Sequence, residues 1–364
     1  MIARRQLLVA SSAALLPSAR AALEYATVTP RRLVFPRDHG AHSEYRIEWW
    51  YLTGWLDVDS RRALGSPQPL GFQITFFRTR TPIDPANPSR FAAHQILFAH
   101  AAVADPARGV LLHDQRIARL GFGVAASDVD ADLALDRWTF KRRASDGFYE
   151  CSIAARGFRL SFTATPTQPL LLQGDGGFSR KGPRAEQASH YYSVPQLSIS
   201  AALARDGRTE KLGGIGWLDH EWSSTVLDPA AAGWDWIGMN LDDGTALTAF
   251  QVRRRDNGAA LHAYASMRVP GAWQLRTFDK DTVRFVPLEH WTSPRTRAVY
   301  PVAQRIEIGG RRFETRPLFA DQEFDTRGTS GTVYWEGASR LFEDGRPVGR
   351  GYLELTGYHS PLTL

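Results

Sequence analysis

The chain has 364 residues, of which 43% are hydrophobic and 23% charged, and its formal net charge is +6. This length is sufficient for two domains with ordinary hydrophobic cores. The charge, which falls to +3 when Arg4, Arg5 and Arg20 are discounted as part of a leader, is too small to indicate a nucleic-acid-binding protein. The single cysteine, Cys151, excludes an internal disulfide, so burial of apolar side chains must stabilise the fold.

The first 21 residues have the pattern of an export signal. Arg4 and Arg5 precede an apolar run from Leu7 to Leu16 that is too short to span a membrane, and Ala19-Arg20-Ala21 offers small residues for cleavage. We therefore expect residues 1–21 to be a signal peptide and the protein to be periplasmic or secreted. The paired arginines leave both the twin-arginine and the general secretion route open. No later apolar run approaches membrane-spanning length.

Most of the remaining chain alternates polar and apolar residues, or forms short aromatic and β-branched runs that end at Gly, Asp-Gly or Pro. Both patterns are typical of antiparallel strands. Helical signals are few, and only residues 106–120 and 228–232 could form a turn or two of helix. The sequence therefore predicts an all-β protein. The expected strands are residues 48–57, 71–79, 95–104, 137–142, 149–156, 158–164, 198–204, 239–241, 246–253, 261–269, 302–308, 311–317, 333–336, 338–343 and 349–356.

A weak internal repeat relates the two halves of the chain. A displacement of 185 residues places Trp49 and Tyr51 over Trp234 and Trp236, and in each half a strand ending in Arg follows. We therefore expect a duplicated meander in which each half closes into a barrel or near-barrel, which protects strand edges. Chance similarity between strand patterns is the alternative. A turn-rich segment near residues 173–187 suggests domains of residues 22–180 and 181–364.

The first candidate site is the run Asp38-His39-Gly40-Ala41-His42 with Glu48. Its two histidines and Glu48 could in principle bind zinc. The spacing falls in a glycine-containing loop, however, and lacks the rigid helical face of usual zinc motifs. We expect His39, His42 and Glu48 to have a structural role, with hydrogen bonds to buried groups at a barrel mouth. We expect neither a metal nor another cofactor.

The second candidate site is the run Gly216-Trp217-Leu218-Asp219-His220-Glu221-Trp222-Ser223, followed by Trp234-Asp235-Trp236. On a strand, the odd-numbered residues of the first run face one side and the even-numbered residues the other. Ionisable groups on both faces require specific partners, so at least one face should line a polar feature. A hydrogen-bond network that joins the two halves is the alternative. The candidate acid, base and orienting groups are Asp219, His220, Glu221 and Asp235.

Further residues could bind a ligand. His94 and His100 are six residues apart and would share one strand face, directed either into an apolar cavity or to the surface. Asn240 and Gln251, on strands after Trp236, could point inward or form cross-strand surface pairs. The expected ligand-binding residues are Trp50, His94, His100, Trp217, Trp222, Trp234, Trp236, Asn240 and Gln251.

Three motifs together resemble those of the AttH-like secreted proteins, which are related to the carotenoid 1,2-hydratases, also called hydroxyneurosporene synthases. They are Asp38-His39-Gly40-Ala41-His42 with Glu48-Trp49-Trp50-Tyr51-Leu52-Thr53-Gly54, the run 216–223, and Trp234-Asp235-Trp236. The resemblance covers essentially the whole chain after the leader and implies a pair of lipocalin-like β-barrels. It does not determine the activity, because this group includes carotenoid hydratases, fungal hydratases of other prenylated compounds, lipocalin-like cyclases and members of unknown role.

For a hydratase, the resemblance implies an acid that protonates an alkene, aromatic faces that stabilise the cation, and a positioned water. The acid would be Asp219, Glu221 or Asp235, and His220 would place the water. The aromatic faces would belong to Trp217, Trp222, Trp234 and Trp236. Gln251 stands where an inward acid would be useful, and an amide cannot donate a proton effectively, so this feature favours ligand binding over hydration.

Three hypotheses for the function follow. The first is an exported protein that binds an apolar ligand, a lipid or an isoprenoid-like molecule, in a pocket lined by tryptophan. The second is a lyase, such as a hydratase of an isoprenoid double bond, or a hydrolase that acts on such a ligand. The third is an accessory module that interacts with an envelope ABC transporter. The binding and enzymatic hypotheses predict the same apolar cavity, and an acid with a perturbed pKa beside it would favour chemistry.

Overall fold

The computed structural model describes residues 24–57, 68–225, 227–272 and 274–362, and these contain 23 strands and one short 3-10 helix, η1 (Arg37–His39). The prediction of an all-β fold is therefore confirmed. The helical turn expected in residues 106–120 is wrong, because Val110–Arg119 pairs along its length as strand β4. The expected signal peptide, residues 1–21, lies outside the described residues. No helix in the described part of the chain is both long and apolar enough to cross a membrane.

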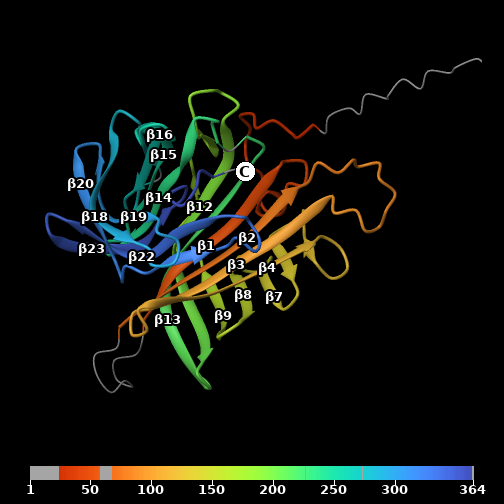
Figure 1. Cartoon of the computed structure of the whole chain (residues 1–364), viewed down its shortest axis with the longest axis horizontal. Helices are drawn as coiled ribbons and strands as arrows, with labels where there is room; N and C mark the ends of the chain where they lie inside the picture. The colour runs from red at the N-terminus through yellow and green to blue at the C-terminus, as the bar shows by residue number, and fades with distance from the viewer. Residues whose placement is uncertain (1–23, 58–67, 226, 273, 363–364) are drawn as a thin grey trace, which may run out of the picture.

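The first sheet has 13 strands, all paired antiparallel, in the order β4-β3-β2-β1-β13-β12-β9-β8-β7-β6-β5, and β10 and β11 also pair with β12. Because β13 returns to pair with β1, the sheet curls, with β4 and β5 as its two edges (Figure 1). Its strands are β1 (Ile47–Asp57), β2 (Leu70–Arg80), β3 (Gln95–Asp105), β4 (Val110–Arg119), β5 (Ala125–Ala126), β6 (Asp132–Leu135), β7 (Trp138–Arg142), β8 (Tyr149–Ala155), β9 (Phe158–Thr165), β10 (Leu171–Leu172), β11 (Phe178–Arg180), β12 (Ala188–Arg205) and β13 (Arg208–Ser223).

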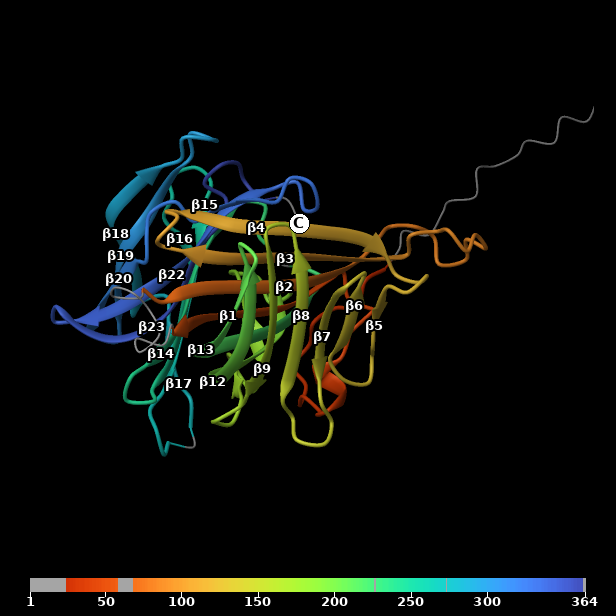
Figure 2. The same cartoon turned by 90° about the horizontal axis from the view of Figure 1, so that it is seen from below.

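The second sheet has ten strands in the order β17-β16-β15-β14-β23-β22-β20-β19-β18, and β21 also pairs with β22. Figure 2 shows it beside the first sheet, with β14, β15 and β16 next to β1 to β4. Its strands are β14 (Ala231–Leu241), β15 (Ala246–Arg254), β16 (Ala260–Arg268), β17 (Arg276–Asp279), β18 (Val283–Thr292), β19 (Val299–Ile308), β20 (Arg311–Pro317), β21 (Glu323–Asp325), β22 (Val333–Glu343) and β23 (Arg346–Leu355).

The two sheets share one topology. In each, the first four strands are neighbours in order, and the first strand also pairs with the last, β13 or β23. Strands β1 and β14, which carry the two halves of the sequence repeat, are therefore equivalent. The change of sheet falls between Ser223 and Ala231, so the boundary expected at residues 180 and 181 does not coincide with it. The reason is that the long strands β12 and β13 pair with β9 and β1 of the first sheet.

Strand alternation divides the buried side chains into three layers. Even-numbered residues of β1, such as Trp50 and Leu52, pack inside the first sheet, and Ile237 and Met239 of β14 pack inside the second. The opposite faces of the same strands form a third apolar layer between the sheets, to which Tyr51, Trp55 and Trp236 contribute. Gly71 allows the close approach, because a Cβ there would lie 2.7 Å from the Tyr352 hydroxyl of the second sheet. Any cavity in this third layer is shared by both sheets.

Candidate functional site

An apolar cavity of about 130 Å³ lies in the layer between the two sheets. Strands β1, β2, β3 and β13 supply one wall, and β14, β15, β22 and β23 supply the other. Most of the lining is aromatic or aliphatic, and four carboxyl groups interrupt it. The residues around the cavity are Ile47, Trp49, Tyr51, Thr75, Phe77, Phe98, His100, Lys181, Asp219, Glu221, Leu227, Trp234, Trp236, Phe250, Val252, Ser330, Thr332, Tyr334, Glu336, Glu354, Thr356 and Leu362.

The duplicated strand order gives the cavity an approximate internal symmetry. Tyr51 of β1 lies opposite Asp219 of β13, and in the second sheet Trp236 of β14 lies opposite Glu354 of β23. Asp219 and Glu354 are therefore equivalent positions. Their neighbours differ, since Ser193 lies beside Asp219 on β12 whereas Glu336 lies beside Glu354 on β22. One wall thus pairs a carboxyl group with a hydroxyl donor, and the other pairs two carboxyl groups.

Three donors surround the carboxyl group of Asp219. Its Oδ1 accepts hydrogen bonds from the Ser193 hydroxyl at 2.5 Å and from Trp217 Nε1 at 2.7 Å, and its Oδ2 accepts one from the Tyr191 hydroxyl at 2.6 Å. Burial raises the pKa of Asp219 to about 7, although the three donors oppose this shift. The arrangement provides a ready-made environment for the anion.

Glu336 and Glu354 form the contrasting pair. Burial, followed by repulsion between the two carboxyl groups, raises the pKa of Glu336 well above its usual value. Burial also raises the pKa of Glu354 to about 7, against a hydrogen bond from Trp234 Nε1 at 3.0 Å. The hydroxyl groups of Tyr51 and Tyr334 interact with the Glu336 carboxyl, but no hydrogen bond of standard geometry reaches its Oε1 from the described residues. This pair holds a proton at neutral pH.

A fourth carboxyl group, Glu221, is neutralised within the cavity wall. Its Oε1 accepts a hydrogen bond from the Ser189 hydroxyl at 2.5 Å and lies 3.0 Å from Lys181 Nζ. The Lys181 ammonium group also lies over the rings of Tyr191 and Phe250, at 4.4 and 4.2 Å from their centroids. These contacts fix the ion pair at an aromatic edge of the cavity.

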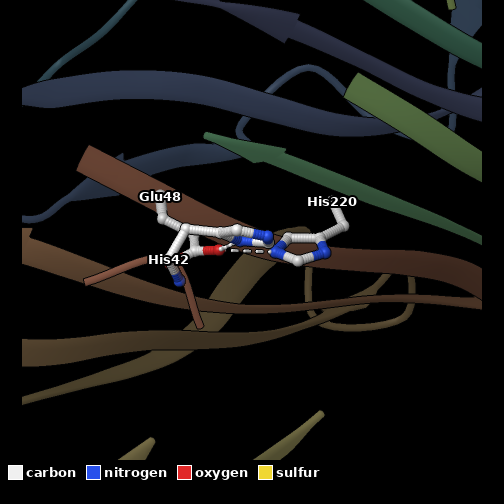
Figure 3. A group of neighbouring side chains, drawn as sticks. All are labelled: His42, Glu48 and His220. Carbon is white, nitrogen blue, oxygen red and sulfur yellow. Dashed lines mark hydrogen bonds and ion pairs between the residues drawn. The ribbon is translucent and has the colours of Figure 1, made fainter. Parts of the chain in front are cut away.

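The even-numbered residues of the central motif lie elsewhere. His220 and Trp222 point into the first sheet with Trp50, so these three do not line the cavity as the sequence suggested. The physical reason is the period of two along β1 and β13. His220 Nε2 lies 2.9 Å from Glu48 Oε1, and His42 Nδ1 lies 2.7 Å from the same oxygen (Figure 3).

The group formed by Asp38, His42, Glu48, Arg78 and His220 joins the N-terminal segment to the first sheet, and we call it the latch. Glu48 also accepts hydrogen bonds from the His42 backbone N–H and from Arg78 Nε, both at 2.8 Å. Burial opposes a charge on His42, but Glu48 and Asp38 raise its pKa, and the ring stacks on Trp222 at 3.7 Å. His39 lies beside this group and bonds the Tyr192 hydroxyl through Nδ1 at 2.7 Å.

The latch contains the three atoms best placed to hold a metal among the described residues, His42 Nδ1, Glu48 Oε1 and His220 Nε2, which lie within 4.8 Å of one another. The donor set fits a proton better than a dication. His42 lies between two carboxylates, as an imidazolium requires, and the Arg78 guanidinium already occupies the other oxygen of Glu48. A metal would add two positive charges beside that buried arginine.

Four other expected ligand-binding or orienting residues lie away from the cavity. Asp235 and Gln251 point into the second sheet, where Asp235 accepts hydrogen bonds from Gln251, Arg253 and Tyr358. Asn240 instead joins the sheets through the Gln196 N–H and the Gly216 carbonyl. His94 precedes β3 and lines a separate surface pocket. Trp217 is buried behind Asp219, to which it donates, and does not line the cavity.

The cavity therefore contains five residues of the expected set, namely Asp219, Glu221, His100, Trp234 and Trp236. Sequence reasoning missed Tyr51, Lys181, Glu336 and Glu354 as functional candidates. Glu336 and Glu354 carry no local motif, and only the pairing of β22 with β23 brings them together. The signal that could have identified them is the repeat, extended to the last strand of each half.

Residues 26–358 match the AttH-like family model, which covers most of the chain. The chain belongs to the AttH-like family. The crystal structure of an AttH protein from Nitrosomonas europaea is 50% identical to this AttH-like chain and superposes with a TM-score of 0.84. The similarity covers 92% of this chain and 99% of the other. The sequence resemblance is thereby confirmed.

More distant structures share the lipocalin-like fold. Kievitone hydratase from Nectria haematococca is 14% identical, with a TM-score of 0.65, over 93% of this chain and 96% of its own. CghA is 12% identical, with a TM-score of 0.54, over 90% and 94%. At these identities the similarity establishes the fold alone. A search of curated proteins finds no match.

Proposed function

We propose that this AttH-like protein binds an apolar small molecule in the cavity between its sheets and transfers a proton to it, as in the hydration or dehydration of a carbon–carbon double bond. The observation that carries this proposal is the Glu336 carboxyl group, which is 2% exposed, faces the apolar cavity, and has no standard hydrogen bond to Oε1 from the described residues. A protonated carboxyl group in such surroundings is a competent general acid.

The cavity limits the part of the ligand that can be enclosed. Its volume of about 130 Å³ is close to that of an engineered cavity of about 150 Å³ that binds benzene. The enclosed group should therefore be an aromatic ring or the terminal five-carbon unit of an isoprenoid. Longer ligands would extend out of the cavity.

The two walls suggest an assignment of acid and base. Glu336, in its pair with Glu354, would donate its proton to the alkene, and the alkene π electrons would form the new C–H bond. The faces of Trp49, Tyr51 and Trp236 would stabilise the resulting tertiary cation. A water molecule would then form the C–O bond and lose its proton to the Asp219 carboxylate. Proton return from Asp219 to Glu336 through solvent would complete the cycle.

Ligand binding without reaction is the second candidate function. It is favoured by the three hydrogen bonds to Asp219, because they occupy both carboxylate oxygens and weaken the group as a base. The fold-level similarity to kievitone hydratase is compatible with either function and identifies no substrate. The hypothesis of an envelope transporter partner gains no support from the comparisons.

Mass spectrometry of solvent extracts from the purified protein, followed by incubation with isoprenoid alkenes in ¹⁸O-labelled water, tests the proposal. We expect an alcohol product that contains ¹⁸O, and a loss of roughly 100-fold or more in rate for Glu336→Gln. The control is Glu289→Gln, which makes the same change at an exposed site on β18. Retention of a ligand without any ¹⁸O incorporation would support binding alone, and absence of both would contradict the proposal.

We also propose that the protein acts outside the cytoplasm. This proposal rests on the composition of residues 1–21, with its arginine pair, apolar run and small-residue cleavage site.

A further inference from the structure

A chain of side-chain hydrogen bonds crosses from one sheet to the other and ends beside Glu336. His100 of β3 is 1% exposed. Its Nδ1 lies 2.9 Å from the hydroxyl of Tyr334 on β22, and its Nε2 lies 2.8 Å from Thr329 Oγ1 in the loop before that strand. Thr329 Oγ1 also lies 2.8 Å from Gln115 Oε1 on β4. Burial lowers the pKa of His100 to about 3, with His113 as a second cause, so its ring is neutral.

The direction of every bond in this chain follows from its far end. Gln115 Nε2 lies 2.9 Å from the backbone carbonyl oxygen of Asp325, which can only accept, so Gln115 places its amide nitrogen there and its oxygen toward Thr329. Both remaining neighbours of the Thr329 hydroxyl, Gln115 Oε1 and the Thr326 carbonyl oxygen at 3.2 Å, are acceptors. Thr329 must therefore donate its only proton to one of them.

The same reasoning continues across His100. Because Thr329 has no proton left for the ring, its oxygen accepts one from His100 Nε2–H. A neutral ring with a proton on Nε2 has an acceptor at Nδ1. The Tyr334 hydroxyl must then donate to Nδ1, and it has no second proton for Glu336.

We propose that His100, oriented by Thr329, keeps the Tyr334 proton turned away from Glu336 and so retains the proton on the Glu336 carboxyl group in the resting protein. His100 is thus a positioning residue, and it acts through Tyr334. The opposite wall of the cavity shows the contrasting case, in which the Tyr191 hydroxyl donates directly to Asp219. This inference deepens the proposed function and rests on it only for the use of the proton in catalysis.

Few groups other than this chain face Glu336. Glu354 on β23 repels its anion, and Tyr51 on β1 and Tyr334 on its own strand present hydroxyl groups. Tyr352 on β23 is a further titratable neighbour, and burial raises its pKa well above the usual value. None of these described neighbours is a cation. The orientation of the two tyrosine hydroxyl groups therefore decides how well a Glu336 anion is supported.

Infrared difference spectroscopy on the ligand-free protein tests the inference without any assay of turnover. The C=O stretch of protonated Glu336 is assigned by its loss in Glu336→Gln and titrated from about pH 5 to about pH 9. In Thr329→Val, the His100 ring is free to carry its proton on Nδ1 and donate to Tyr334, which can then donate to Glu336. We expect the midpoint of the band to fall by about one pH unit or more.

The matched control is Thr332→Val, since Thr332 also lines the cavity but lies outside the chain. Its midpoint should equal that of the wild type. An unchanged midpoint in Thr329→Val would overturn the inference. The wild-type protein provides a second measurement that needs no variant: ¹⁵N NMR of the imidazole should show a neutral His100 ring protonated on Nε2, and a proton on Nδ1 would also overturn it. Either result would leave the binding or turnover of an apolar ligand open to its own test.

Discussion

Replacement of Glu354 by Gln should stabilise the protein at alkaline pH and leave its stability unchanged in acid. Burial raises the pKa of Glu354 from 4.5 to about 7, so the folded state resists an ionisation that the unfolded chain accepts. Below the unfolded pKa both states are protonated, and the carboxyl group has no effect on the free energy of unfolding. As the pH rises through the folded pKa, the wild type loses stability that the amide variant retains.

The size of the effect follows from the same shift. A rise from 4.5 to about 7 corresponds to roughly 3 kcal/mol, fully developed above about pH 7. The amide preserves the volume and can still accept the hydrogen bond from Trp234 Nε1. It also removes the repulsion that Glu336 experiences, which acts in the same direction.

Urea denaturation of the wild type and Glu354→Gln at about pH 4 and about pH 8 measures the difference. The control is Glu289→Gln at an exposed site of the second sheet, for which the two curves should remain parallel. Equal stability of the wild type and Glu354→Gln at both pH values would refute the reasoning, because it would mean that solvent reaches this carboxyl group in the folded protein.

Three further predictions follow from the latch, the cavity wall and the leader. Glu48→Gln should lower the free energy of unfolding by about 3–5 kcal/mol in urea denaturation, since it leaves Arg78 and the His42 cation without their shared anion; the His42 contribution should be complete below about pH 6.5 and disappear as the pH rises through its raised folded pKa. Trp236→Leu should reduce the rise in thermal midpoint caused by bromobenzene, whereas Trp222→Leu should lower the midpoint itself and leave that rise intact. Intact mass of the exported protein should correspond to a chain that begins near Ala22, and a major cytoplasmic form that retains residues 1–21 would contradict this.

The alternation along β1 and β13 could be predicted from the sequence, and it separates Asp219 and Glu221 from His220 and Trp222 correctly. The error lay in placing both faces in one pocket. A strand buried on both sides looks the same whichever side holds the cavity, because its polar residues need partners in either case. Only the packing of a second sheet against Tyr51 and Trp217 distinguishes the two faces.

The change of sheet and the second pair of carboxyl groups could not be predicted, for a related reason. Turn residues near 180 mark a loop, but they do not determine that β12 then pairs with β9. Glu336 and Glu354 lie 18 residues apart in unremarkable strands and become partners only through the register of β22 and β23. Non-local pairing of this kind depends on tertiary structure, which short sequence patterns do not record.

The most direct test of the central claim is a crystal structure of the protein soaked with bromobenzene, an apolar probe whose ring suits the cavity and whose bromine gives an anomalous signal. We predict the anomalous peak between the two sheets, within contact distance of Trp236 and on the side of Glu336 and Glu354. A peak inside the first sheet beside Trp50 and Trp222, with the space between the sheets unoccupied, would contradict the account.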